Sequence, residues 1–258
     1  MKKTAVIIVA ALLAALPFKA SAQQQAGYFD HVSAGVTLGI LDGVGVNAAA
    51  SLGSLFQVRA GYQQLFGAKY EDMKIEQMEF DNGNKYDIDL GAKLNVGNAS
   101  LLFDYFPSGA GFHVTAGAYI GSSKFVQVYT TKPVPMDPSD YNAVYYKAGD
   151  EKIYTDKDGN VEAGVKVSAF KPYLGIGFGR AASASKKLAV TFDIGAAYWG
   201  DPWLYVNDGK GRDVKVTSEM LKKDDNTYYD EGKIDEYSST WWLNFMPVVK
   251  LSIFYKLF

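Results

Sequence analysis

The residues of this chain that could catalyse a reaction are few. Histidine occurs only at His31 and His113, and cysteine is absent. A hydrolase of the Ser-His-acid type needs a histidine within hydrogen-bond reach of its nucleophile and of its orienting acid. The sequence places no such set around either histidine, and the lack of cysteine excludes thiol and Cys-metal chemistry. We therefore expect no enzyme and no cofactor, and two histidines that serve as inward-facing structural donors.

Two further segments carry residues that bind ions or phosphates in other proteins. Residues 156–160, DKDGN, begin like a calcium loop, but the twelfth position is Val167 where that loop has glutamate. A hairpin tip explains the segment more simply. The glycines of residues 171–180, KPYLGIGFGR, alternate and do not follow the phosphate-binding fingerprint. We predict no metal site, and glycines that relieve crowding in a narrow interior.

The N-terminus has the composition of an export signal. Two lysines precede an apolar stretch over residues 5–16, and the small residues 20–22 follow. This stretch falls short of the about 20 residues that a membrane-spanning helix requires. We expect residues 1–22 to be a cleaved signal peptide and residues 23–258 to form one domain.

Composition limits what that domain does. The net charge of −2 gives no indication of a nucleic-acid partner. Nothing after residue 22 is long and apolar enough for a transmembrane helix. If the exported chain enters a bilayer, it must close its strands into a barrel, which pairs every backbone group without helices. The 26 glycines and 14% aromatic residues fit that class.

Alternation of apolar and polar residues predicts the strands. In the C-terminal run, residues 241–258, one face carries Leu251, Ile253 and Tyr255 while Lys250 and Ser252 lie on the other. The same period of two appears in seven earlier segments, namely residues 31–40, 44–52, 56–63, 86–106, 112–120, 171–180 and 188–199.

The segment 86–106 needs separate treatment, because its apolar face changes phase at Gly97-Asn98. It is either one long strand with a β-bulge or a hairpin of two short strands. The hairpin would give nine strands and place the long loops on the periplasmic side, whereas bacterial barrels have even strand numbers and long outer loops. We therefore predict an all-β fold, an eight-stranded antiparallel transmembrane β-barrel. Ten strands result if parts of residues 67–85 or of the last long loop pair in the wall.

The segments LGIGFG (174–179) and DIGAAYWGDP (193–202), with the export signal and the terminal Phe258, give the chain a recognisable likeness. It resembles the small eight-stranded outer-membrane proteins, the superfamily of OmpA transmembrane domains, OmpX and OmpW, over the whole mature chain. The resemblance implies residence in the outer membrane, contact with its lipid, and recognition of the C-terminal strand by the barrel-assembly machinery. Lys256 departs from the pattern, because that superfamily usually has an aromatic or apolar residue there.

Parity places several charged side chains inside the predicted barrel. An eight-stranded barrel has an interior just wide enough to be filled by side chains. Charges of both signs in a dry interior must pair, since an unpaired buried charge is very costly. The set is either a salt-bridged plug or a polar conduit, and its principal members are Arg59, Lys93, Asp104, Asp193 and Lys250.

The long loops are rich in tyrosine. Tyrosine offers a wide contact area at low entropic cost, so these loops are candidates for binding an extracellular ligand. The alternative is that the rings extend the strands and form aromatic girdles. The candidates are Tyr145, Tyr146, Tyr154, Tyr228 and Tyr229. We expect a structural or surface-interaction protein with a plugged lumen, or alternatively a narrow pore for small molecules.

Overall fold

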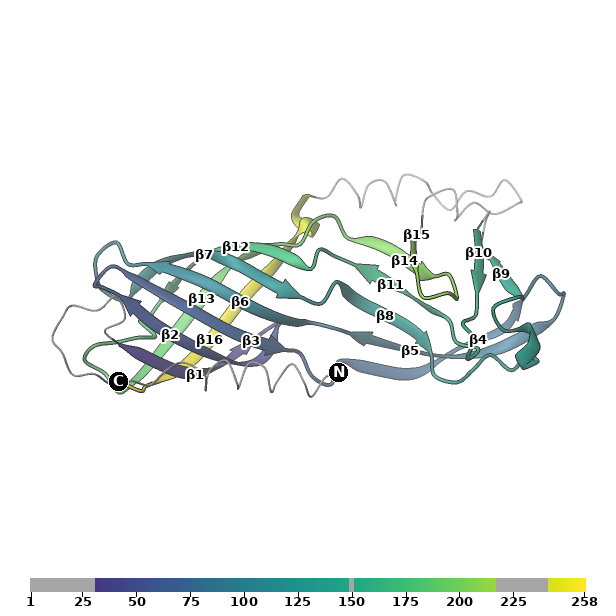
Figure 1. The fold of residues 1–258 in the computed structure, drawn as a ribbon, viewed down its shortest axis with the longest axis horizontal. Coiled ribbons are helices and arrows are strands. Elements are labelled where there is room, and N and C mark those ends of the chain that lie inside the picture. Colours follow the sequence, from purple (N-terminus) through teal and green to yellow (C-terminus); the bar gives the residue numbers. More distant parts are fainter. Residues whose placement is uncertain (1–30, 149–150, 217–240) are drawn as a thin grey trace.

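A closed antiparallel β-barrel of eight strands forms one half of the molecule (Figure 1). The computed structural model describes residues 31–148, 151–216 and 241–258. Around the ring the strands follow the order β1-β16-β13-β12-β7-β6-β3-β2, so the predicted all-β, eight-stranded fold is confirmed. Their bounds are β1 Val32–Gly39, β2 Gly43–Leu52, β3 Phe56–Gln64, β6 Gly97–Tyr105, β7 Phe112–Gly121, β12 Phe170–Phe178, β13 Leu188–Tyr198 and β16 Phe245–Lys256.

The described residues include no helix with the length and apolarity of a membrane span.

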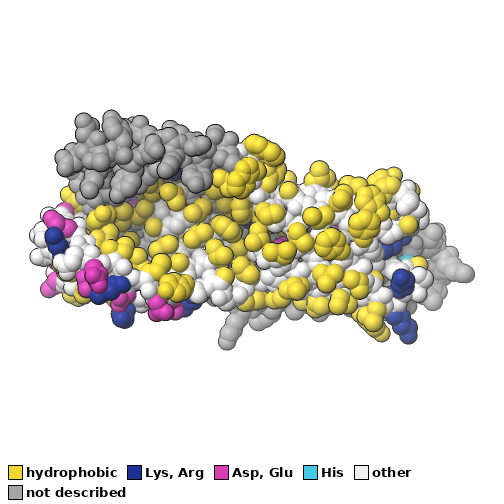
Figure 2. Space-filling view, turned by 180° about the vertical axis from the view of Figure 1, so that it is seen from behind, with side chains coloured by type: hydrophobic (Ala, Val, Ile, Leu, Met, Phe, Trp, Pro, Cys, Tyr) yellow, Lys and Arg dark blue, Asp and Glu magenta, His cyan; other side chains and the backbone are white. Residues whose placement is uncertain are grey.

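Alternation sorts the residues of the barrel into two faces. Val36 and Leu38 on β1 are 59% and 60% exposed, whereas their neighbour Thr37 is buried. Because successive side chains of a strand point to opposite faces, the wall is apolar outside and largely polar inside. Figure 2 shows hydrophobic side chains spread over one face of the barrel half.

A second sheet continues the barrel wall at one end, and we call it the extension. It has six strands in the order β15-β14-β11-β8-β5-β4, and most of them prolong a barrel strand along the chain. For example, β3 leads into β4 and β13 into β14, while β1, β2 and β16 have no counterpart in it. The bounds are β4 Lys69–Glu79, β5 Lys85–Leu94, β8 Lys124–Thr130, β11 Glu162–Lys166, β14 Trp203–Asn207 and β15 Asp213–Lys215. The other end of the barrel, which we call the short-turn end, carries only brief connections.

The phase change near residue 97 lies where barrel and extension meet. β5 pairs with β4 and β8, β6 pairs with β3 and β7, and neither pairs with the other. Residues 85–105 therefore do not form a hairpin. They run in one direction with an irregularity between β5 and β6, in agreement with the predicted bulge. The stretches that a ten-stranded barrel would recruit, residues 69–79 and 203–215, pair in the extension instead.

The long connection between β8 and β11 has a core of its own. The hairpin of β9 (Tyr145–Ala148) and β10 (Glu151–Tyr154) and the short 3-10 helix Pro138–Asp140 lie in it. Phe80 and Ile88 from the β4–β5 hairpin pack with residues of this connection. The buried partners in the connection are Val134, Met136 and Val144. The tip of the extension is thus a packed unit.

Candidate functional site

A network of charged side chains crosses the lumen near the short-turn end. Arg59 on β3 donates from Nη1 and Nη2 to the two carboxylate oxygens of Asp193 on β13, at 2.8 and 2.7 Å. Its Nη2 also donates to Asp104 Oδ1 on β6 at 2.8 Å. β3 and β13 lie on opposite sides of the ring, so the forked Arg59–Asp193 pair spans the barrel. We call these three residues, with the polar groups bound to them, the lumen network.

The carboxylates of the lumen network have further donors. Asp104 accepts hydrogen bonds from the Thr115 hydroxyl at 2.7 Å and from the Gln57 amide at 2.6 Å. Asp104 and Thr115 are fully buried. Because an unpaired charge inside a protein is costly, this nearly complete pairing is what allows the charges to remain in the interior.

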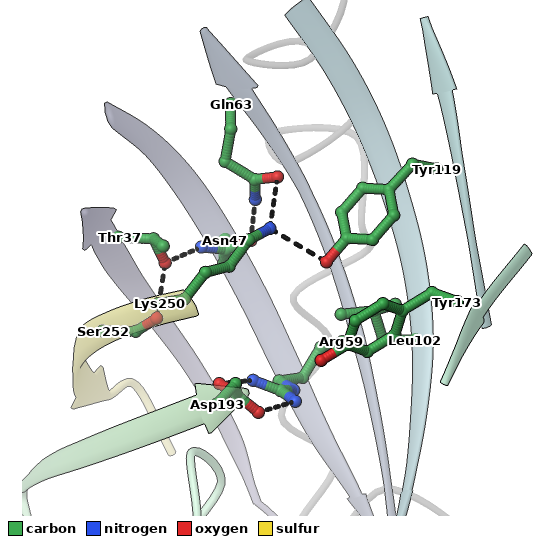
Figure 3. Close-up of a pocket in the computed structure, with 10 residues that line it drawn as sticks. All are labelled: Thr37, Asn47, Arg59, Gln63, Leu102, Tyr119, Tyr173, Asp193, Lys250 and Ser252. Carbon is green, nitrogen blue, oxygen red and sulfur yellow. Dashed lines mark hydrogen bonds and ion pairs between the residues drawn. The ribbon is translucent and has the colours of Figure 1, made fainter. Parts of the chain in front are cut away.

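A second cluster lies closer to the extension and is centred on Lys250 of β16 (Figure 3). The ammonium pairs with Asp42 at 2.7 Å and donates to Gln63 at 3.0 Å and to the Tyr119 hydroxyl at 2.9 Å. It also lies 4.3 Å from the centre of the Tyr119 ring. Between this cluster and the lumen network the free space is a cavity of only about 10 Å³. This is about the room that one water molecule needs.

The mouth next to the extension is covered by apolar side chains. Trp199 lies beside Phe125, with ring centres 4.9 Å apart, and its indole nitrogen donates to the Leu243 carbonyl at 2.6 Å. These rings pack against a buried cluster that continues into the barrel and includes Leu102, Tyr119, Val167, Tyr173, Met246 and Val248. Directly beside it, the buried Lys171 donates to Asn98 Oδ1 at 3.0 Å.

The opposite mouth is covered by the β12–β13 turn, residues 179–187. The Ala182 amide donates to Gln57 Oε1 at 2.7 Å, and the Ala181 carbonyl accepts from the Ser33 hydroxyl at 2.8 Å. Ala181 and Ala182 are buried with Ala49, Ala189 and Phe254 of the barrel. The turn therefore folds under the barrel and fills its short-turn end, and Gln57 links it to the lumen network.

His113 belongs to the lumen network and has both ring nitrogens engaged. Nε2 lies 3.0 Å from Asp193 Oδ1, and Nδ1 lies 3.3 Å from the Gly111 carbonyl oxygen. Both ring nitrogens therefore lie within hydrogen-bond distance of an oxygen acceptor. His113 is buried, as expected of an inward-facing donor.

The extension has an ion-pair network of its own, centred on Glu162 of β11. Lys124 donates to Glu162 at 2.7 Å and to Asp213 at 3.1 Å, while Tyr205 donates to Glu162 at 2.7 Å. Partial burial opposes the ionisation of Glu162 and Asp213. The hydrogen bonds that these carboxylates accept outweigh this cost and lower the pKa of both groups. The strongest contributions are the bond from Lys124 to Glu162 and the bond from Lys166 to Asp213. The network ties β8, β11, β14 and β15 together.

The structure joins some of the predicted lumen residues and separates others. Arg59, Asp104 and Asp193 meet in the lumen network, and Lys250 forms the second cluster. The prediction for Lys93 is wrong, because Lys93 lies on β5 in the extension, outside the barrel. The prediction assumes that residues before and after the irregularity at residues 95–96 belong to the same barrel strand. The Lys93 ammonium instead lies 4.9 Å over the Tyr129 ring.

The tyrosines proposed as loop contacts have different surroundings. Tyr145 and Tyr154 lie together on the β9–β10 hairpin, with ring centres 5.4 Å apart. Tyr146 packs against Phe80 at 6.2 Å, as part of the core of the extension tip. Tyr228 and Tyr229 lie outside the described residues.

Comparisons with known proteins find little. No protein-family model matches the chain, and no curated protein matches it significantly. Among solved structures, the crystal structure of CarO from Acinetobacter baumannii is similar to it. The two are 19% identical with a TM-score of 0.43, covering 86% of this chain and 96% of that one. This level of similarity assigns neither a family nor a function.

Two parts of the site were missed by reasoning from the sequence. Asp42 lies in the β1–β2 turn, where an LDG sequence indicates a surface turn and not a counter-ion for Lys250. Residues 179–187 have the small and polar composition of an ordinary connection. Gln63 and Tyr119 lie in phase with the interior residues of their strands, so alternation alone is a signal for them as partners of an interior lysine.

Proposed function

We propose that this chain is an outer-membrane β-barrel protein with a closed lumen and a structural or surface-interaction role. The apolar outer wall supports insertion into lipid. β13 has 11 residues, and at about 3.3 Å per residue and a tilt of about 45° it rises about 25 Å. That height matches the apolar band of bacterial barrels. In this proposal outer-membrane lipid surrounds the wall, and β16 is the strand that the assembly machinery recognises.

Aromatic rings at both ends of the barrel support this placement. Phe112 and Phe178 lie side by side at the short-turn end, with ring centres 5.5 Å apart. Tyr198 and Phe245 do the same next to the extension at 5.4 Å, and Trp241 meets Phe245 edge to face, with ring centres 6.1 Å apart. Amphipathic rings favour the two interfaces of a bilayer. The extension would then project outwards from the cell, with the short-turn end in the periplasm.

The observation that supports a closed lumen is that both mouths are covered and that charged side chains pair across the barrel between them. Apolar rings cover one mouth, the β12–β13 turn covers the other, and the charged groups between them are paired across the barrel. A conduit would require both coverings to move and the Arg59–Asp193 fork to break. A hydrolase is disfavoured as well, because His113 has no free ring nitrogen to deprotonate a nucleophile.

Conductance across a planar bilayer tests this proposal against the narrow pore. We expect no steady current from the purified protein, because in this proposal the covered mouths and the paired charges between them interrupt any water path. A variant lacking residues 181–185 loses the covering of the short-turn end but keeps the apolar covering next to the extension. We therefore expect at most brief channel openings from it. A steady single-channel current from the unmodified protein would establish the pore instead. As a control, each sample is run on an SDS gel with and without heating. A difference in mobility between heated and unheated protein shows that the sample contains closed barrels.

A further inference from the structure

A pocket of about 580 Å³ lies at the far tip of the extension, between two hairpins. The β9–β10 hairpin forms one wall and the β14–β15 hairpin the other. Its lining is mainly polar and basic, and consists of Asn142, Ala143, Lys152, Tyr154, Asp208, Lys210, Arg212 and Val214. Three of these side chains are cations and one is an anion. The pocket is therefore positive on a chain whose net charge is −2.

The single carboxylate of the lining is engaged within its own turn. Asp208 accepts hydrogen bonds from the backbone amides of Lys210 and Arg212, both at 2.9 Å, and from Arg212 Nε at 2.8 Å. These bonds, the Arg212 backbone amide foremost, lower the pKa of Asp208. Among the described residues no carboxylate lies within ion-pair distance of Lys152 or Lys210. Two lysines thus line the pocket without a counter-charge from those residues, and the Lys152 ammonium lies 4.4 Å from the centre of the Tyr145 ring.

The two walls of the pocket are packed against each other at Gly209, which lies against the Thr155 carbonyl, the Asn142 side chain and Tyr154. Within the first wall, the hydroxyl of the buried Thr155 accepts a hydrogen bond from the Asn142 backbone N–H at 3.2 Å. Gly209 has a φ of +73° and no room for a Cβ, which allows the β14–β15 turn to approach this closely. A preformed site loses less conformational entropy when a ligand binds.

We propose that this pocket binds a phosphorylated saccharide. Phosphate oxygens accept hydrogen bonds from lysine and arginine and would offset the excess positive charge. Tyr154 and Asn142 supply a ring face and an amide for sugar hydroxyls. A volume of about 580 Å³ suits one or two sugar rings and is too small for a folded partner. The inference rests on the proposed function, which places this tip outside the cell among phosphate-bearing glycans.

Calorimetry on the full mature chain in detergent tests the site. The probes are glucose 6-phosphate, inorganic phosphate and glucose. We expect glucose 6-phosphate to bind most tightly and glucose not to bind. The double variant Lys152→Ala/Lys210→Ala should weaken binding at least about tenfold, because it removes two charged hydrogen-bond donors. Lys157→Ala removes an exposed lysine nearby that does not line the pocket, and should change the affinity less than about twofold.

The proposal is overturned if glucose 6-phosphate does not bind, or if it binds the double variant and the Lys157→Ala control equally. Heat-sensitive mobility in SDS, measured on each sample, keeps the outcomes separate. A chain that shifts with heat but binds no sugar phosphate retains the barrel proposal and loses this one. A chain without the shift loses the barrel, and the binding result for the pocket still stands.

Two membrane compositions distinguish the sources of the ligand. In nanodiscs of phosphatidylcholine the pocket is free. If phosphates of lipopolysaccharide in the same membrane fill it, discs that contain lipopolysaccharide should weaken glucose 6-phosphate binding at least about tenfold, and dephosphorylated lipopolysaccharide should not. If the ligand is a free saccharide, the affinity should be equal in all discs. Both results support the site and assign its source.

Discussion

At the scale of single residues, Arg59 is the group on which the lumen depends most. It binds Asp104 on the neighbouring strand β6 and Asp193 on β13 across the barrel, and all three groups are buried. Replacing a buried ion pair by apolar groups of similar volume is often neutral, whereas removing one partner leaves an uncompensated charge. The cost of a change at Arg59 therefore depends on what is done to its partners.

We predict that Arg59→Met lowers the free energy of unfolding by about 3–5 kcal/mol, because it leaves Asp104 and Asp193 facing each other without a cation. Urea unfolding in detergent micelles measures this loss. The triple variant with Asp104→Asn and Asp193→Asn should recover part of it. If Arg59→Met costs no more than the surface change Lys157→Ala, the charges are not held in a dry interior.

At the scale of elements, the β12–β13 turn and the extension are two additions to a plain barrel. Gly179 begins the turn with a φ of +96°, and a Cβ there would meet the Val190 carbonyl oxygen. Gly109, in another turn of the short-turn end, has a φ of +67° but open space around it. The two glycines therefore separate the cost of backbone conformation from the cost of close packing.

We expect Gly179→Asn to destabilise the protein by about 1–3 kcal/mol, since it adds a steric conflict to backbone strain. Gly109→Asn should cost less than about 1 kcal/mol, because asparagine tolerates a positive φ. Thermal or urea unfolding of the pair measures the difference. Equal effects would mean that Gly179 does not lie against β13 at Val190 as described.

Acid should loosen the extension before the barrel. Glu162 and Asp213 have lowered pKa values in the folded chain, so their ion pairs contribute stability that is complete above the ordinary carboxyl pKa of about 4. That contribution is lost as the pH falls below about 4 and through the lowered values. Proteolysis between β11 and β15 at stepped pH should detect the loosening. In Glu162→Gln this acid dependence should be weaker, and an unchanged profile would contradict the assignment.

At the scale of the whole molecule, the question is which surface meets lipid. Leu174 on β12 is 65% exposed on the outer wall, whereas Thr115 on the adjacent β7 is fully buried. The two lie at the same height, because Thr115 pairs with Gly175. The chain has no cysteine, so a single introduced cysteine can be labelled without background.

We predict that a fluorophore on Leu174→Cys is quenched by lipid-phase quenchers and not by water-soluble ones. Thr115→Cys should react with neither lipid-soluble nor water-soluble reagents until the protein is unfolded. Fluorescence in liposomes measures both. Quenching of the Leu174 label from water would mean that the outer wall is not embedded, and labelling of Thr115 from water would indicate an open lumen.

Sequence reasoning succeeded where one rule governs every residue. Outward-facing and interior positions alternate along each barrel strand, so the alternation predicts eight strands and the faces of Arg59, Asp104 and Asp193. It failed beyond the barrel, because strands of the extension alternate in the same way and the pattern does not reveal which sheet they join. Lys93 was misplaced for this reason. The turn at residues 179–187 was missed because its burial depends on Gln57 and Ser33, which are remote in sequence.

The continuity of strands from barrel to extension has a mechanical consequence. A load applied at the tip, such as drag from a bound particle, is directed along strands that run on into the barrel wall (Figure 1). The interstrand hydrogen bonds lie across that direction. Such a pull shears many bonds at once and does not peel them apart one by one. The tip is thus anchored by the full length of the wall, and it should withstand tension far better than a loop hinged at its base.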